Sequence, residues 1–205
     1  RQRQMCIRDS LMPKLYAPEL TKDSCGFGLI ANIEGRASHK LVRNAITGLA
    51  RMQHRGAILA DGKTGDGCGI SLQMPQQFFQ TISKEMGLPL PEHFAVGMVF
   101  FPQDKQKVTV LKNIIQQELE QETLPAIGWR EVPINKSVLG DIAASSLPWI
   151  QQIFIAAPPG WKAKDVERRL FMARRRIEKK INDKDFYICS LSTQILIYKG
   201  LCMPS

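Results

Sequence analysis

The chain has 205 residues, 44% of them hydrophobic, which suits one globular domain or one lobe of a larger one and excludes a disordered composition. No apolar run approaches the ~20 residues that span a bilayer, and the N-terminus lacks the apolar core of a secretory signal, so we expect no membrane and a cytoplasmic location. The net charge of +9 leaves a nucleic-acid partner open. Five widely spaced cysteines without a C-x-x-C pair argue against a zinc knuckle or a disulfide framework.

The N-terminal segment divides into two parts before any regular pattern begins. Residues 1–11, "RQRQMCIRDSL", have no hydrophobic period and no starting Met, so we expect them to be a non-native leader. Met12 is a plausible start. Residues 13–24 contain two prolines and several polar residues and predict an extended leader.

The first predicted elements are a strand, a helix and a turn. "CGFGLIANI", 25–33, is apolar on both faces, which is typical of a strand in a covered sheet. Residues 38–56 have the apolar stripe of an amphipathic helix, with Ser38 as N-cap and Gly56 in the C′ position. Four glycines in 60–69 predict a tight turn.

The rest of the chain alternates groups of strands with single helices. We predict helices over 107–122 and 162–180, the latter with its apolar residues facing inward. We predict strands over 70–74, 94–101, 128–134, 150–158, 185–192 and 195–200, the last two as a hairpin or strand pair. This order favours an α+β fold with a largely antiparallel sheet. Because the sequence stops directly after a strand pattern, we expect it to be cut off at the C-terminus.

Cys25 is a candidate nucleophile. If the chain were cut between Ser24 and Cys25, the new α-amine, whose reference pKa is about 7.7–8.0, would take a proton from the thiol. Gly26 and Gly28 keep side chains away from the flanking backbone and let a substrate approach. The alternative is a buried structural cysteine on a glycine-containing strand.

The glycine-rich segment 51–70 leaves several interpretations to weigh. "GKT" at 62–64 is not a P-loop, because Ala57 stands where that motif needs glycine. His54 and Arg55 position a substrate or merely cap the helix. No metal site is predicted, because the spacing of His39, His54, Cys68 and His93 is not that of ligands.

The helix 162–180 carries nine Lys/Arg against three acids. Arg168 and Arg175 are spaced to reach phosphates of a nucleic acid. A solvated face or a subunit contact is the favoured alternative, since Glu167 and Glu178 are interleaved with the cations.

Two long motifs carry a family resemblance. "CGFGLIANIEG" and "LARMQHRGAILADGKTGDGCGISLQMP" resemble the N-terminal class II glutamine amidotransferase domain of the large (alpha) subunits of bacterial glutamate synthases. The resemblance continues through "GWREVPIN", "LPWIQQIFI", "ERRLFMARRRIEK", "DFYICSLS" and "YKGLCMP", and covers residues 14–205.

The resemblance implies an N-terminal-nucleophile (Ntn) hydrolase fold, an αββα four-layer sandwich on two antiparallel sheets, here incomplete at the C-terminus. It implies that residues 12–24 are a propeptide, removed to expose Cys25, and that 25–205 is a partial glutamine amidotransferase type 2 domain. Cys25 would then attack L-glutamine through a thioester, with its own α-amine as base. Arg55 and Gly56 would support the substrate pocket, and no metal is implied in this chain.

The resemblance also implies partners and cofactors outside this chain. In the complete enzyme, ammonia from glutamine is channelled to 2-oxoglutarate for reductive glutamate biosynthesis in nitrogen assimilation. FMN and an iron–sulfur cluster would lie in the rest of the large subunit, and NADPH on a small (beta) subunit. No "NG" pair, the oxyanion donor of related amidotransferases, occurs in the sequence. We therefore expect little glutaminase activity from the 205 residues alone, because losing one such donor costs ~10²–10³ in rate.

Overall fold

The computed structural model describes residues 26–53 and 56–200 and has an α+β architecture, as predicted. Its helices are α2 (His39–Arg51), α3 (Gln76–Glu85), α4 (Lys105–Gln121), α5 (Asp141–Ser145) and α6 (Ala163–Lys180), with a short 3-10 helix at Lys136–Val138. Its strands are β1 (Cys68–Gln73), β2 (Phe94–Phe101), β3 (Ala126–Glu131), β4 (Trp149–Ala156), β5 (Tyr187–Ser192) and β6 (Ile195–Gly200).

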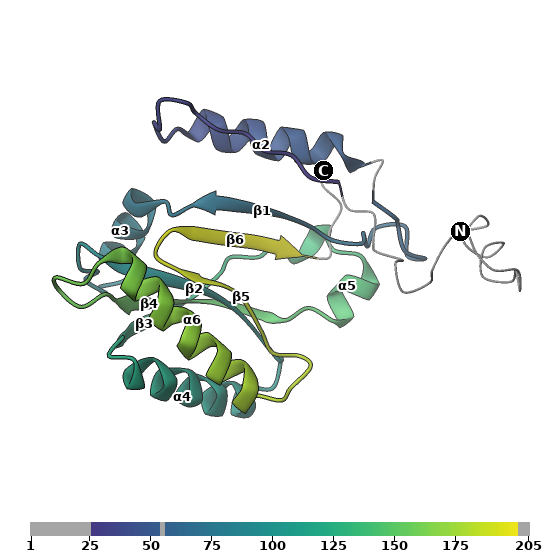
Figure 1. Ribbon diagram of the computed structural model, residues 1–205. Helices are drawn as coiled ribbons and strands as arrows, with labels where there is room; N and C mark the ends of the chain where they lie inside the picture. The colour runs from purple at the N-terminus through teal and green to yellow at the C-terminus, as the bar shows by residue number, and fades with distance from the viewer. Residues whose placement is uncertain (1–25, 54–55, 201–205) are drawn as a thin grey trace, which may run out of the picture.

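The strands form two antiparallel sheets, one of four strands in the order β3-β4-β2-β5 and one of two strands, β1-β6. Figure 1 shows α2 along the outer side of β1 and β6, and α4 and α6 on the far side of the four-stranded sheet. The predicted antiparallel pairing is therefore confirmed for both sheets.

The central strand β2 shows why a contiguous apolar run predicts a covered strand. Seven of its eight residues are buried, because helices lie on one of its faces and the second sheet on the other. Gly97 is needed at its middle: a Cβ there would lie 2.6 Å from Ile153 Cγ2 and 2.8 Å from Leu191 Cδ1. Side chains of both neighbouring strands therefore occupy the space that a side chain at position 97 would need.

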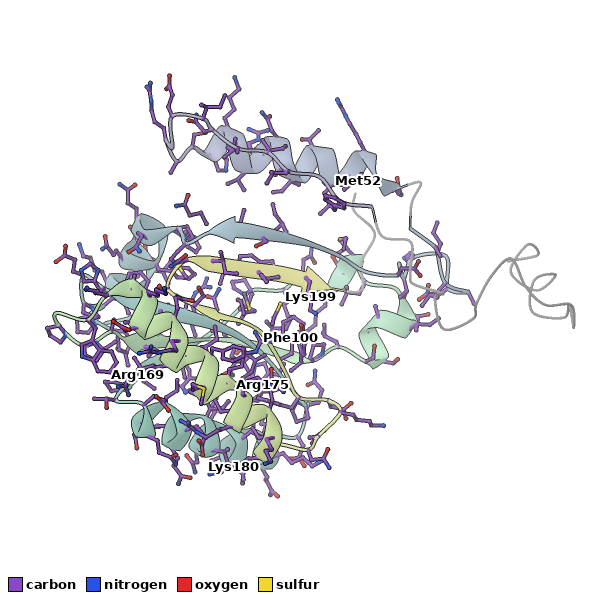
Figure 2. All side chains as sticks on the ribbon, in the orientation of Figure 1. Met52, Phe100, Arg169, Arg175, Lys180 and Lys199 are labelled. Carbon is purple, nitrogen blue, oxygen red and sulfur yellow. The ribbon has the colours of Figure 1, made fainter. Side chains whose placement is uncertain are left out.

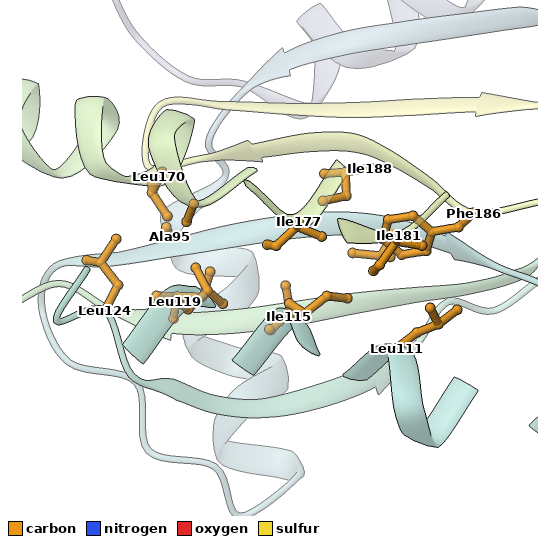
Figure 3. Packing of buried hydrophobic residues seen from close by; sticks show 14 of the residues in the cluster. Ala95, Leu111, Ile115, Leu119, Leu124, Leu170, Ile177, Ile181, Phe186 and Ile188 are labelled. Atoms are coloured by element: carbon orange, nitrogen blue, oxygen red, sulfur yellow. The ribbon is translucent and has the colours of Figure 1, made fainter. Parts of the chain in front are cut away.

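The larger hydrophobic core lies between the four-stranded sheet and the helices α4 and α6 (Figure 3). The inward stripe predicted for the helix over 162–180 is confirmed in α6, since Val166, Leu170, Ala173 and Ile177 are all buried. A smaller core fills the space between the sheets, and Phe79 of α3 packs there edge-on against Phe154 with ring centroids 5.6 Å apart.

The charges of α6 are largely used inside the molecule. Arg176 Nε donates to Glu118 Oε2 at 2.7 Å, and Lys180 also pairs with Glu118, which is fully buried on α4. Two of the outward cations have partners on their own helix: Arg168 pairs with Asp165 at 3.1 Å and Arg175 with Glu178 at 2.9 Å. Figure 2 shows Arg169, Arg175 and Lys180 following one another along α6. The arrangement favours a solvated and intramolecularly paired face over a phosphate-binding one.

Three sequence predictions differ from the structure. Residues 26–33 do not form a strand, and Phe27, Leu29 and Ile33 are exposed, because no strand among the described residues pairs with them. The backbone instead turns after Asn32, whose side-chain oxygen accepts hydrogen bonds from the amides of Glu34 and Arg36. The helix predicted over 38–56 ends at Arg51, and the C-cap is Met52.

The third difference concerns the end of the chain. β5 and β6 do not form a hairpin, because the chain crosses from the larger sheet to the smaller one between them, and β6 pairs with β1. Glu167 of α6 fixes this crossing by accepting hydrogen bonds from the Ser192 hydroxyl at 3.0 Å and the Thr193 amide at 2.5 Å. Sequence reasoning also missed α3 and α5.

Among the residues described, no helix combines the length and apolarity needed to cross a bilayer.

Candidate active site

Only part of the predicted site lies among the residues that the structure describes. Cys25, His54 and Arg55 lie outside the described residues. Gly56 is described and exposed, and its amide donates to Gln53 O at 3.1 Å in a turn that follows α2. The structure therefore does not test the expected placement of Arg55 and Gly56 beside Cys25, and both roles stay predictions.

The glycine-rich segment after Gly56 forms a closed loop rather than a phosphate cradle. Its two ends are joined by hydrogen bonds in both directions, from Ala57 N to Asp66 Oδ2 at 2.9 Å and from Asp66 N to Ala57 O at 3.2 Å. Further in, Leu59 N donates to Thr64 O at 2.8 Å. Gly62 has a φ of 70°, in the left-handed region that glycine enters without strain. We call residues 57–66 the glycine loop.

Asp61 lies at the tip of the glycine loop and accepts hydrogen bonds from two directions. Its Oδ1 accepts from the backbone amide of Thr64 at 2.8 Å, and its Oδ2 accepts from the Thr64 hydroxyl at 2.5 Å. The same Oδ2 accepts from the amide of Ile142 in the first turn of α5, at 3.0 Å. These bonds, led by those from the Thr64 hydroxyl and amide, hold the pKa of Asp61 well below its usual range.

Thr64 provides the second link between the glycine loop and α5. Its side chain is completely buried, and its hydroxyl accepts from the amide of Ala143 at 3.1 Å while donating to Asp61. Gly140, just before the helix, makes room for both: a Cβ there would overlap Asp61 Oδ2 and lie 2.5 Å from Thr64 Oγ1. Two orphan amides at the start of α5 are thus satisfied by side chains about eighty residues away in sequence.

The glycine loop leads directly into β1, and its exit is also tightly packed. Cys68 opens β1 opposite Gly200 of β6. A Cβ at Gly69 would lie 2.7 Å from the Tyr198 carbonyl oxygen, so this residue allows the two backbones to approach. The loop is therefore held by α5 at its tip and by the small sheet at its exit.

A chain of polar side chains links the two sheets behind β6. Arg130 Nη1 donates to Gln152 Oε1 at 2.8 Å, and Gln152 Nε2 donates to the Tyr198 hydroxyl at 3.2 Å. Gln152 is fully buried on β4, so these bonds satisfy a polar group that would otherwise be costly in the core. The network orients β6 against the larger sheet.

A half-open groove of about 170 Å³ runs between α6, β5 and β6. Its lining is mixed, from Phe171, Ile195 and Ile197 to Glu167 and Arg174. The Cys189 thiol lies here and donates to Ile197 O at 3.6 Å, and burial raises its pKa. Cys189 is also buried on β5, and both its burial and its raised pKa disfavour a reactive thiolate.

No group of three or more His, Cys, Asp or Glu within the described ranges is arranged to hold a metal ion. His39 and His93 are both exposed, and His54 lies outside these ranges.

Comparison with known proteins identifies the class. The model of the family described as "Glutamine amidotransferases class-II" matches residues 25–205. The chain therefore belongs to the class-II glutamine amidotransferases.

Within this class the chain is similar to the amidotransferase region of glutamate synthase large chains, as the motifs predicted. It is 39% identical over 199 residues to the glutamate synthase [NADPH] large chain of Bacillus subtilis, covering 94% of this chain. It is 41% identical over 193 residues to that of Azospirillum brasilense, covering 91% of this chain. It is also 39% identical over 197 residues to ferredoxin-dependent glutamate synthase 2 of Synechocystis, covering 94%. The chain spans about 13% of the length of each of these relatives.

The relatives include NADPH- and ferredoxin-dependent proteins at nearly equal identity, and some are chloroplastic. The similarity therefore does not distinguish the electron donor. The sequence predicted a tight turn over 60–69 but did not reveal its attachment to α5. The available signal was Asp61 three residues before Thr64, a spacing typical of side-chain-to-backbone turns.

Proposed function

We propose that this chain is the glutaminase part of a glutamate synthase and hydrolyses L-glutamine to glutamate and ammonia. The observation that carries the proposal is the class-II amidotransferase match over residues 25–205, which begins at Cys25 itself. The architecture supports it as well: helix, small sheet, large sheet and helices follow one another as in an αββα sandwich of an Ntn hydrolase (Figure 1).

In the proposed mechanism, removal of residues 12–24 leaves Cys25 as the first residue. Its α-amine takes the thiol proton, and Sγ attacks the side-chain amide carbon of glutamine. The C–N bond of the resulting tetrahedral intermediate breaks, and the ammonium form of the α-amine protonates the departing ammonia. Water then hydrolyses the γ-glutamyl thioester, which releases glutamate and restores the thiol.

Arg55 and Gly56 are proposed to form the wall of the glutamine pocket. Their position in the chain supports this role, because they directly precede the glycine loop. A rigid loop at this place would hold the pocket wall without requiring further ordering when the substrate binds.

The reductive half of the reaction is assigned to other parts of the enzyme. There, FMN and an iron–sulfur cluster, with NADPH on a small subunit, would supply the electrons that convert 2-oxoglutarate and ammonia to glutamate. The described cysteines do not fit an iron–sulfur cluster, because Cys68 opens β1 of the small sheet while Cys189 lies on β5 of the large one.

The test is ammonia release from L-glutamine by the full-length protein, compared with a Cys25→Ala variant. We expect release that is lost in the variant, and glutamate synthesis supported by NADPH when the small subunit is present. If ferredoxin supports glutamate synthesis and NADPH does not, NADPH is the wrong electron donor in this proposal. Absence of ammonia release from the unmodified protein would instead favour a non-catalytic homologue.

A further inference from the structure

We propose that Asp61 and Thr64 are positioning residues of the glutaminase site, because they fix the glycine loop on α5 and thereby hold the backbone that follows Arg55 and Gly56. This inference rests on the proposed function. Neither residue is assigned a role by the chemistry of Cys25, yet both are tied to α5 by bonds that span about eighty residues of sequence.

The first step of the argument is the connection between the two elements. Asp61 Oδ2 accepts from the amide of Ile142, and Thr64 Oγ1 accepts from the amide of Ala143. The Thr64 hydroxyl then donates to Asp61, so the two acceptors support one another. Such a bond arrangement defines both the distance and the rotation of the loop relative to α5.

The second step is the tight fit. Thr64 is completely buried and Asp61 is half-buried, so water does not easily replace a lost partner of Thr64. Gly140 leaves no space for even a methyl group beside them. The loop therefore has one docked position rather than several.

The third step is transmission to the predicted pocket wall. The far end of the glycine loop is closed by the paired bonds between Ala57 and Asp66. Ala57 is bonded directly to Gly56, so a displacement of the loop moves Gly56 with it. Because a misplacement of about 1 Å in a site costs up to ~100-fold in rate, the Asp61–Thr64 contact should be measurable in catalysis.

The experiment uses the full-length protein with Asp61→Asn and Thr64→Val, which keep side-chain size and remove the carboxylate or the hydroxyl. Thr64→Ser restores the hydroxyl. Asp141→Asn is the matched control, because Asp141 is an exposed carboxylate in the first turn of the same helix. Glutamine hydrolysis gives kcat and KM, and thermal unfolding reports folding.

We expect Asp61→Asn and Thr64→Val to lower kcat/KM for glutamine at least ~10-fold while remaining folded, and Thr64→Ser and Asp141→Asn to stay within about 2-fold of the unmodified protein. Alkylation of Cys25 by iodoacetamide should keep its rate in all four variants, since that reagent needs no glutamine pocket. Folded Asp61→Asn and Thr64→Val with unchanged kcat/KM would overturn the inference alone. An inactive unmodified protein would overturn the proposed function instead.

If both substitutions prevent folding, hydrogen exchange in the unmodified protein still tests the inference. Labelling of Cys25 by a glutamine-analogue electrophile should slow hydrogen exchange at the Ile142 and Ala143 amides, because coupling between two sites is reciprocal. Exchange at these amides that is the same before and after labelling would contradict the inference.

Discussion

The buried carboxylate of Glu118 offers a sharp test of how α4 and α6 are joined. Its side chain is almost fully buried and pairs with Arg176 at 2.7 Å and with Lys180. A hydrogen bond to a charged group contributes roughly 1.5–3 kcal/mol, but both cations are partly exposed and regain water when the carboxylate is removed. We therefore expect Glu118→Gln to lower the free energy of unfolding by about 2 kcal/mol.

A loss of this size should lower the Tm of a chain of this length by roughly 4–8 °C. The assay is thermal and urea unfolding followed by circular dichroism. Glu120→Gln is the matched control, because Glu120 is an exposed residue of the same helix. Its carboxylate accepts a hydrogen bond from the Gln116 side chain at 3.0 Å. Glu120→Gln should change the free energy of unfolding by less than about 0.5 kcal/mol.

A double-mutant cycle with Arg176→Met isolates the pair from the rest of the network. We expect a coupling free energy of about 1 kcal/mol or more between Glu118 and Arg176. Additive effects of the two substitutions, within ~0.3 kcal/mol, would refute the conclusion that this ion pair joins the two helices.

Further predictions concern pH, close packing and thiol reactivity. Hydrogen bonds from Lys180 and Arg176 lower the pKa of Glu118, so its contribution to stability is complete above the carboxyl's usual pKa of about 4.3 and is lost as pH falls through the lower folded value. Between pH 2 and 5, the free energy of unfolding should therefore depend less on pH in Glu118→Gln than in the unmodified protein. Gly97→Ala should cost ~1–3 kcal/mol in urea unfolding, since its Cβ would overlap the side chains of Ile153 and Leu191; an unchanged midpoint would contradict the packing. Burial raises the pKa of Cys189, so at pH 8 iodoacetamide should modify Cys68 before Cys189, as read by peptide mass mapping. Modification of Cys189 before Cys68 would contradict the burial of the Cys189 thiol on β5.

The sequence predicted most accurately those elements whose conformation is determined by a pattern in their own residues. The run at β2 and the helical period of α6 predicted their elements closely, because each pattern is repeated over eight or more residues. The helix α3 was missed because it begins after Pro75 without a side-chain cap, and α5 because it has only five residues.

Predictions failed where distant segments decide the outcome. Residues 26–33 have the composition of a strand, but a strand needs a partner, and none pairs with them among the residues described. The crossing between β5 and β6 depends on Glu167, which no local pattern reveals. The prediction of Cys25 as nucleophile came from the family motifs and stays a prediction, while the contact of Asp61 and Thr64 with α5 needed the folded chain.

The most direct test of the central claim is the intact mass of the full-length protein after incubation with a glutamine-analogue electrophile. We predict a mature chain that begins at Cys25 and carries one adduct, mapped to that residue. A chain that retains residues 12–24 and carries no adduct at Cys25 would contradict the assignment of this protein as a glutaminase.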